Sequence, residues 1–449
     1  MMHLVRLLAL CLALVACSSD QAYRQPVEQP RPFVAGQANS YSLEEHAYQV
    51  ADDAGHFYLG YVEFDDQGWY HDIRQQQGLL SWLRAQHARS PSRQYLLVTY
   101  AHGWKHNARA FDPDVDNFRK LLQTLAVQEQ AAQRLDPAHM ARTVVGVYLG
   151  WRGESISVPL FKELTFWTRK NAAERVGHRS AKSLLMLLNQ FRAFSNGWCT
   201  SNILAGPHET QLVFIGHSFG GLLMYNALQT EITDRALRLN QAGAFRTAKS
   251  FGDFVLLINP AFEGASYESL WQAGLMRTYT SSQRPIMAIV TSAADWATRV
   301  AFPAGRLYTF AQSAPQDGER DSVLYAIGHL ERYRTHTLAA TAAPPSKPQS
   351  ERSVTEAAAT LTAIQSQKSA PTAPGEQLVF DHGILTRQDN PQGIPDFPYL
   401  SIYTDASMIK DHNDIWNEQF RKFMFEFVTK QVMQYRERSA SPASCGPDD

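Results

Sequence analysis

The stretch QLVFIGHSFGGLLMYNAL, residues 211–228, decides the expected fold of this chain. An apolar run leads into a glycine-rich turn and then into an apolar helical face, with Ser218 at the turn. In this strand–turn–helix context the glycines remove side chains that would collide with the strand or the helix, so the serine oxygen stands clear beside the first N–H groups of the helix. The stretch therefore predicts a nucleophile elbow. The alternative is a glycine-rich turn in which Ser218 only caps the helix.

Other apolar runs along the chain predict further strands of one sheet. These runs, rich in β-branched residues and separated by helical stretches, cover residues 95–100, 143–149, 254–258, 285–291 and 399–403. Such a pattern is typical of an α/β fold whose mostly parallel sheet is covered by helices on both faces. Helices are expected near residues 76–87, 115–135 and 415–432, and an antiparallel hairpin is expected from residues 58–63 and 69–73.

Two insertions interrupt this pattern within a single domain expected over residues 40–438. Residues 153–207 have a helical, aromatic composition and lie just before the elbow strand, so they predict a cap over the path of the substrate. Residues 337–376 contain almost no large apolar side chains and predict a disordered surface loop before the last strand. A polar tail follows over residues 439–449.

The N-terminus is typical of a targeting signal. Arg6 is followed by an apolar run over residues 7–15, which ends in Leu-Val-Ala-Cys at residues 14–17. This segment resembles a bacterial lipoprotein signal that leaves Cys17 as the lipidated first residue; the alternative is an ordinary secretory signal with an incidental cysteine. Residues 18–39 are polar and predict a flexible tether. With Ser18 after the cysteine, the expected location is the cell envelope, at the outer membrane facing the periplasm.

Composition and cysteine usage narrow the function classes. The chain has 44% hydrophobic residues and a net charge of -1, and no basic patch predicts nucleic-acid binding. Apart from Cys11 in the signal and Cys17, the cysteines are Cys199 and Cys445, which could pair in an oxidising compartment. No CxxC motif and no metal-ligand spacing occurs, so neither a metal nor an organic cofactor is expected.

A reactive serine needs a histidine base and a carboxylate that orients it, and after such an elbow these follow in the order serine, acid, histidine. The histidines downstream of the elbow are His329, His336, His382 and His412. Only His412 lies between the last expected strand and the last helix, where a loop can bring it over Ser218. His412 is therefore the expected base.

The acid has two candidates. Asp295 follows the expected strand over residues 285–291, and Glu263 follows the strand before it. Aspartate is the more common acid in such triads, which favours Asp295 and leaves Glu263 as the alternative. Asp411 and Asp414 are expected to cap the loop that carries the histidine.

The expected oxyanion hole uses two backbone N–H groups. His102-Gly103-Trp104 follows the strand over residues 95–100, and the residue after such a His-Gly pair donates its N–H. Trp104 is therefore the first expected donor, and Phe219, directly after the nucleophile, is the second.

The chain resembles a family of bacterial α/β-hydrolases, most of them uncharacterised. The similar segments are YVEFDDQGW, TYAHGWKHNA, VYLGWRGES, LTFWTRKNAAERVG, GHSFGG, LINPAFEG, TSAADWAT and DHNDIW, which spread over most of the chain after residue 58. The resemblance implies an α/β-hydrolase fold with a triad of Ser218, Asp295 and His412. It implies little about the substrate.

The expected function is hydrolysis of a carboxylic ester through an acyl-enzyme, on a small-molecule or lipid substrate. An amidase or thioesterase could use the same triad. A catalytically silent, envelope-anchored binding protein is the alternative from another class.

Overall fold

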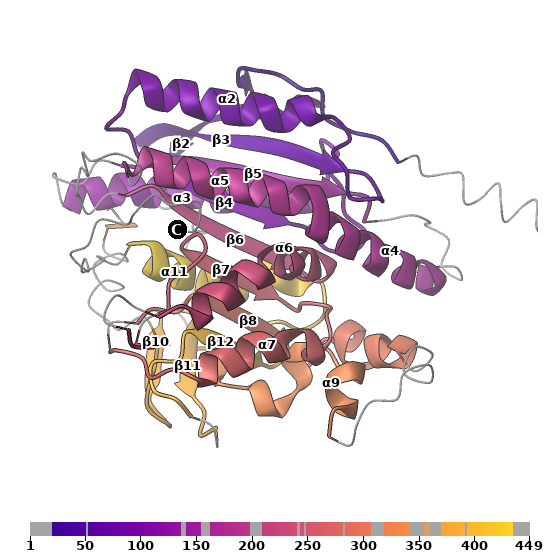
Figure 1. The fold of residues 1–449 in the computed structure, drawn as a ribbon. Helices are drawn as coiled ribbons and strands as arrows, with labels where there is room; N and C mark the ends of the chain where they lie inside the picture. Colours follow the sequence, from indigo (N-terminus) through magenta and orange to yellow (C-terminus); the bar gives the residue numbers. More distant parts are fainter. Residues whose placement is uncertain are drawn as a thin grey trace, which may run out of the picture.

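The chain has an α/β architecture in which helices cover both faces of one mostly parallel, mixed sheet (Figure 1). The computed structural model describes residues 20–50, 53–135, 141–153, 162–197, 209–239, 243–246, 248–281, 283–306, 318–341, 354–355, 357–358, 370–390 and 393–433. The strands are β1 Arg31–Pro32, β2 Leu43–Val50, β3 Asp53–Phe64, β4 Tyr95–Ala101, β5 Thr143–Trp151, β6 Gln211–His217, β7 Phe254–Ile258, β8 Met287–Ser292, β9 His336–Ala339, β10 Gln377–Phe380, β11 Gly383–Arg387 and β12 Tyr399–Thr404.

The helices connect and cover these strands. They are α2 Ile73–Arg89, α3 Pro113–Leu135, α4 Lys162–Val176, α5 Lys182–Ser195, α6 Phe219–Leu237, α7 Gly264–Leu275, α9 Arg320–Leu324 and α11 Glu418–Met433. Short helical turns are η2 Gly177–Ala181, η3 Ala297–Ala301, η4 Ile327–His329, η5 Glu331–Tyr333 and η7 Asp414–Trp416.

The strand order of the sheet is β1-β2-β3-β5-β4-β6-β7-β8-β12-β9-β11-β10. From β3 to β9 every neighbouring pair is parallel, whereas β2 is antiparallel to β3, and β11 is antiparallel to β9 and β10. The loops that follow the parallel strands therefore gather at one edge of the sheet, called here the carboxyl edge. In register, Ala101 of β4 lies opposite Gly216 of β6, and His217 lies opposite Ile258 of β7.

Helices form a layer on each face of the sheet. Figure 1 shows α2, α5, α6 and α7 on the near face and α3 with α11 behind it. Each layer closes its own hydrophobic core: Leu83, Leu188 and Leu223 belong to the first cluster, and Phe118 and Phe420 to the second. The strands between the layers are buried on both faces, which is why they read as continuous apolar runs in the sequence.

The central elements confirm the expected order of strands and helices. All residues of β4, β6, β7 and β8 are buried, and the expected strand over residues 399–403 is β12. The expected helices correspond to α2, α3 and α11.

The expected hairpin from residues 58–63 and 69–73 is wrong. The antiparallel partner of β3 is β2, which precedes it, and residues 69–73 contribute only an isolated bridge between Phe64 and Tyr70 before α2 begins. Strand β2 is difficult to recognise in the sequence because it contains a charged residue, Glu44, at a buried position. The Glu44 carboxylate forms ion pairs with Arg24 and Arg119, which lie far from it along the chain.

The expected flexible tether over residues 18–39 is too long. From Asp20 onward the chain packs against the domain: the backbone N–H groups of Tyr23 and Arg24 donate to the two carboxylate oxygens of Glu63, each over 2.8 Å, and β1 pairs with β2. The packed chain therefore begins about twenty residues before the expected boundary at residue 40. Buried polar contacts hold these residues against the domain, and no apolar run in the sequence indicates such packing.

The helical insertion over residues 153–207 is only partly a cap. Helix α5 lies on the sheet, with Leu184 and Leu188 in the hydrophobic core, so it is a sheet-covering helix. Phe166 of α4 reaches Phe219 beside the elbow, with ring centroids 4.6 Å apart. The capping part is therefore the first half of α4, and residues 154–161 and 198–207 lie outside the described residues.

The insertion over residues 337–376 is not a wholly disordered loop. Its start forms β9, and Val354 and Ala357 are buried in the second hydrophobic cluster. The Val354 N–H donates to Asp53 Oδ2 over 2.9 Å. Residues 342–353, 356 and 359–369 of this insertion lie outside the described residues.

Several expectations fall outside the described residues. These are the signal peptide over residues 1–17 with Cys17, the polar tail over residues 439–449, and both Cys199 and Cys445. Within the described ranges, no helix combines the length and apolar character needed to cross a membrane.

Candidate active site

The elbow places Ser218 in a strained backbone conformation between β6 and α6. Its φ of 56° and ψ of -121° are rare for a residue with a side chain. A Cβ at Gly220 would lie 2.0 Å from the carbonyl oxygen of Ala101, and one at Gly216 would lie 2.6 Å from that of Gly220. Both positions therefore require glycine. Ser218 is only 2% exposed, so its environment is shielded from bulk water.

His412 lies over the serine. It comes from the loop between β12 and η7, and its Nε2 is 2.6 Å from Ser218 Oγ. Its Nδ1 is 2.8 Å from Asp295 Oδ2. With the Nδ1 proton donated to the carboxylate, Nε2 is free to accept the serine proton. The three residues expected to form a triad are thus in one hydrogen-bonded chain.

Asp295 is fully buried at the carboxyl edge, just after β8. The Thr298 N–H donates to Oδ1 over 3.1 Å, and the Thr298 hydroxyl donates to Oδ2 over 2.5 Å. Burial raises the pKa of the Asp295 carboxyl, but the charge of His412 and the hydrogen bonds from His412 and Thr298 outweigh it, and the net shift lowers the pKa. Asp295 is therefore held as a carboxylate against His412.

A further histidine extends this chain. His329 Nε2 lies 2.9 Å from Thr298 Oγ1. Because the Thr298 hydroxyl proton goes to Asp295, His329 donates its Nε2–H to the hydroxyl oxygen. Burial lowers the pKa of His329 to about 4, so the ring is neutral near pH 7. The hydrogen-bonded order is Ser218, His412, Asp295, Thr298 and His329.

The loop that carries His412 is tied to the sheet by polar groups beside the elbow. The carbonyl oxygen of His412 accepts hydrogen bonds from His217 Nε2 over 2.9 Å and from Asn259 Nδ2 over 3.3 Å. The Ser292 hydroxyl donates to the carbonyl of Ile409 over 2.6 Å. Asn259 has a positive φ of 43°, and its Oδ1 accepts from the Ser292 N–H. These hydrogen bonds position the backbone of His412 and therefore its imidazole relative to Ser218.

Trp104 and Phe219, the residues expected to supply the oxyanion-hole N–H groups, follow β4 and begin α6. A Cβ at Gly103 would lie 3.1 Å from Ser218 Cβ, so the His102-Gly103-Trp104 turn passes directly beside Ser218. The ring of Phe166 contacts both Trp104 and Phe219, with centroid separations of 5.7 Å and 4.6 Å. Three aromatic rings, from the loop after β4, from α4 and from α6, therefore border the site.

Glu263, the alternative acid, faces a different set of partners. Its carboxylate lies 3.1 Å from Lys170 Nζ and 3.1 Å from Arg306 Nη1. These ion pairs join the start of α7 to α4 and to the segment after η3. The carboxylate that contacts His412 is that of Asp295.

The other histidine candidates are used elsewhere. His336 Nε2 lies 3.0 Å from the carbonyl of Pro371, and His382 Nδ1 lies 2.6 Å from Glu426 Oε1. As expected, Asp411 and Asp414 cap their own loop, since they accept from the N–H groups of Asn413 and Lys410.

Sequence reasoning missed the groups that support the triad. Thr298, three residues after Asp295, matches the local pattern in which a carboxylate accepts from the backbone and side chain of a residue three positions on. That spacing was a usable signal. His329 and Asn259 had none, because only folding brings them to the site.

Among the described residues, no group of three or more histidine, cysteine, aspartate or glutamate side chains could hold a metal ion. No family model, curated protein or solved structure matches this chain.

Proposed function

We propose that this chain is a serine hydrolase of the α/β-hydrolase type that cleaves carboxylic esters through an acyl-enzyme. The observation that carries the proposal is the hydrogen-bonded series from Ser218 Oγ through His412 to Asp295, with distances of 2.6 Å and 2.8 Å. A serine held in a strained elbow, with an imidazole within hydrogen-bond distance of its oxygen and a buried carboxylate behind that imidazole, is the arrangement that acyl transfer needs.

In the first half of the reaction, Ser218 Oγ attacks the ester carbonyl carbon and its proton passes to His412 Nε2. Asp295 stabilises the resulting imidazolium, and the N–H groups of Trp104 and Phe219 donate to the oxyanion. His412 then gives the proton to the departing alcohol. In the second half, water attacks the acyl-enzyme with His412 again as the base, and Ser218 is released with the acid product.

The aromatic border of the site supports an apolar acyl or aryl group over a charged one. The half-buried rings of Trp104 and Phe166 contact each other, and burial of an apolar chain against them is favourable. The expected signal over residues 1–17 supports a second part of the proposal: a lipidated Cys17 anchors the enzyme in the bacterial envelope, at the outer membrane facing the periplasm.

A fluorophosphonate probe tests the proposal directly, because it reacts with activated serines. The parent protein should be labelled and should hydrolyse activated esters, whereas Ser218→Ala should lose both, with turnover reduced by about 10⁶. Ser269→Ala, on the exposed surface of α7, is the matched control and should behave like the parent. Activated esters of increasing chain length, with amide and thioester analogues, then define the reaction. An unlabelled parent protein would favour a silent binding protein instead.

A further inference from the structure

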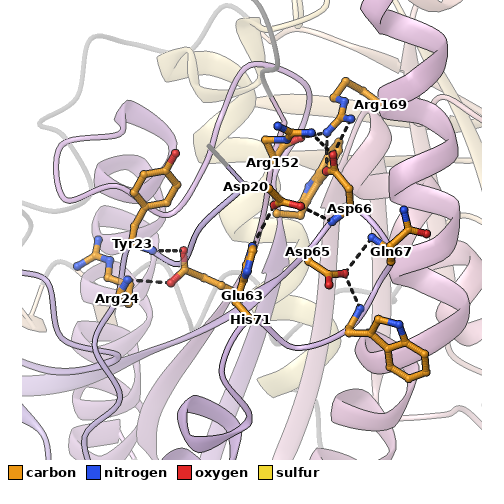
Figure 2. Close-up of polar contacts among 12 residues, drawn as sticks. Asp20, Tyr23, Arg24, Glu63, Asp65, Asp66, Gln67, His71, Arg152 and Arg169 are labelled. Carbon is orange, nitrogen blue, oxygen red and sulfur yellow. Dashed lines mark hydrogen bonds and ion pairs between the residues drawn. The ribbon is translucent and has the colours of Figure 1, made fainter. Parts of the chain in front are cut away.

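Residues 20–24 are fastened to the carboxyl edge of the sheet (Figure 2). Asp20 Oδ1 lies 3.1 Å from His71 Nε2, and Asp20 Oδ2 accepts from the Asp66 N–H over 3.1 Å. Asp66 lies two residues after β3 and forms ion pairs with Arg169, at 2.6 Å, and with Arg152, which follows β5. The chain therefore enters the domain at the same edge of the sheet where β6 delivers Ser218.

The distance from this point to the expected lipid is short. Only Ser18 and Ser19 lie between Cys17 and Asp20, and an extended chain spans at most about 3.6 Å per residue step, so over three steps the cysteine stays within roughly 11 Å of Asp20. From β3 to β6 the sheet crosses β5 and β4, which at about 4.8 Å per strand is roughly 14 Å. A lipid on Cys17 would therefore hold the edge that carries Ser218 close to the membrane.

The same edge presents exposed aromatic side chains. Trp69, Phe111 and Trp296 are 58%, 61% and 65% exposed. They lie in the segments after β3, β4 and β8, on both sides of β6, the strand that leads into Ser218. Single exposed aromatic side chains are ordinary on a protein surface, but three that share an edge with the nucleophile and the chain entrance form a pattern.

The opposite edge provides the contrast. Among the exposed tryptophan and phenylalanine side chains of the described residues, only Phe194 lies elsewhere, at the end of α5 near the start of β6. Basic groups accompany the aromatic residues of the carboxyl edge: the Arg179 guanidinium lies 5.3 Å from the centre of the Trp69 ring, and Arg299 is exposed beside Trp296. Aromatic rings with adjacent cations suit the headgroup region of a bilayer.

We propose that the carboxyl edge is a membrane-docking face, seated by Trp69, Phe111 and Trp296 on the phospholipid bilayer that anchors the chain. Its substrates are then acyl esters held in that bilayer, which reach Ser218 without crossing bulk water. This inference rests on the proposed hydrolysis at Ser218 and on lipidation of Cys17.

The test uses the full lipidated chain in vesicles of phosphatidylethanolamine and phosphatidylglycerol. Two double variants are compared: Trp69→Ser with Phe111→Ser at the docking face, and Phe194→Ser with Leu237→Ser at the opposite edge. Trp296 is left intact because it adjoins Asp295. Each protein is assayed on a water-soluble short-chain ester and on a long-chain fluorogenic ester embedded in the vesicle.

Both double variants should match the parent on the soluble ester. On the embedded ester, the docking-face variant should fall by about tenfold while the opposite-edge variant stays unchanged. Equal losses in the two variants, or no loss in either, would overturn the docking face.

A second measurement needs no catalysis. Vesicles that contain brominated lipid should quench the parent more than Trp69→Phe, since Phe keeps the apolar contact but removes the reporter; vesicles without bromine give the control. Bromine quenching without hydrolysis of the soluble ester would reject the proposed function and leave the docking face standing. Hydrolysis of the soluble ester with equal quenching of parent and variant would do the reverse.

Discussion

His217 Nε2 lies 2.9 Å from the carbonyl oxygen of His412, so the residue directly before Ser218 holds the backbone of the histidine that contacts Ser218. Burial and the charge of His412 lower the pKa of His217 to about 3, and the ring stays neutral with its proton on Nε2. His217 Nδ1 is buried without a hydrogen-bond partner among the described residues, so the hydrogen bond of this ring there is the one from Nε2 to the His412 carbonyl. The turn around Ser218 thereby fixes the position of His412 as well as that of Ser218.

Replacing His217 with Phe should loosen this contact while keeping a ring in the same space. The carbonyl of His412 would retain only the longer hydrogen bond from Asn259. We expect kcat on a soluble ester to fall about tenfold, the equivalent of one lost hydrogen bond, with a smaller change in KM. His178→Phe, on the exposed surface, is the control. An unchanged kcat for His217→Phe would show that the loop carrying His412 keeps its position without this hydrogen bond.

Asp295→Asn should reduce turnover by about 10⁴, because an amide in this position favours the wrong tautomer of His412. Glu263→Gln should leave turnover within a few-fold of the parent. It should instead lower the melting temperature, because Arg306 loses its ion pair with Glu263 while Lys170 keeps only its pair with Glu174; breaking a buried ion pair costs about 3 kcal/mol. Steady-state kinetics and thermal melting of both variants check this. A reversed pattern would identify Glu263 as the acid.

Thr298→Val should affect catalysis through Asp295 without touching the substrate. The variant loses the hydroxyl hydrogen bond to Oδ2 and the contact with His329. We expect the pKa of Asp295 to rise and kcat to fall by about tenfold, as for loss of a hydrogen bond to a charged group. The His412 Nδ1 proton resonance should also shift, which a general loss of stability would not cause. Thr386→Val on β11 provides the matched control.

Buried neutral histidines predict loss of stability in mild acid. Burial lowers the pKa of His336 to about 3 and that of His102 to about 4, whereas in the unfolded chain each is about 6.5. Between pH 6.5 and 4 the unfolded state therefore binds more protons, and the free energy of unfolding decreases as the pH falls, by about 1.4 kcal/mol per pH unit for each group. Urea titrations at several pH values measure this slope. His336→Gln should make it shallower, and His178→Gln should leave it as it is.

Cys17→Ser should release an otherwise membrane-retained protein, because the lipid would be its anchor. Fractionation of cells that express each form decides between the alternatives. A Cys11→Ser variant, altered within the expected signal, serves as the control. Equal membrane retention of Cys17→Ser and the parent would mean that another contact holds the chain there.

The sequence by itself determined the central sheet and the identity of the three residues in contact at the site. Strands β4, β6, β7 and β8 are buried on both faces, and burial on both faces leaves a continuous apolar run that needs no partner to be recognised. Ser218 could be recognised from the sequence because a strained turn requires glycines at fixed positions around it. Asp295 and His412 followed from the order of strands, although Glu263 remained open until its ion pairs were visible.

Only the tertiary structure revealed the outer strands of the sheet and the groups that surround Ser218, Asp295 and His412. Strand β2 carries the buried Glu44, which reads as a surface residue until Arg24 and Arg119 neutralise it. His329 likewise reads as a surface histidine until folding brings it to Thr298. A local sequence pattern reflects the contacts and hydrogen bonds that a residue makes with its neighbours in the sequence. A buried charge or a neutral imidazole is satisfied by groups brought from elsewhere in the chain, and that pairing exists only after the chain has folded.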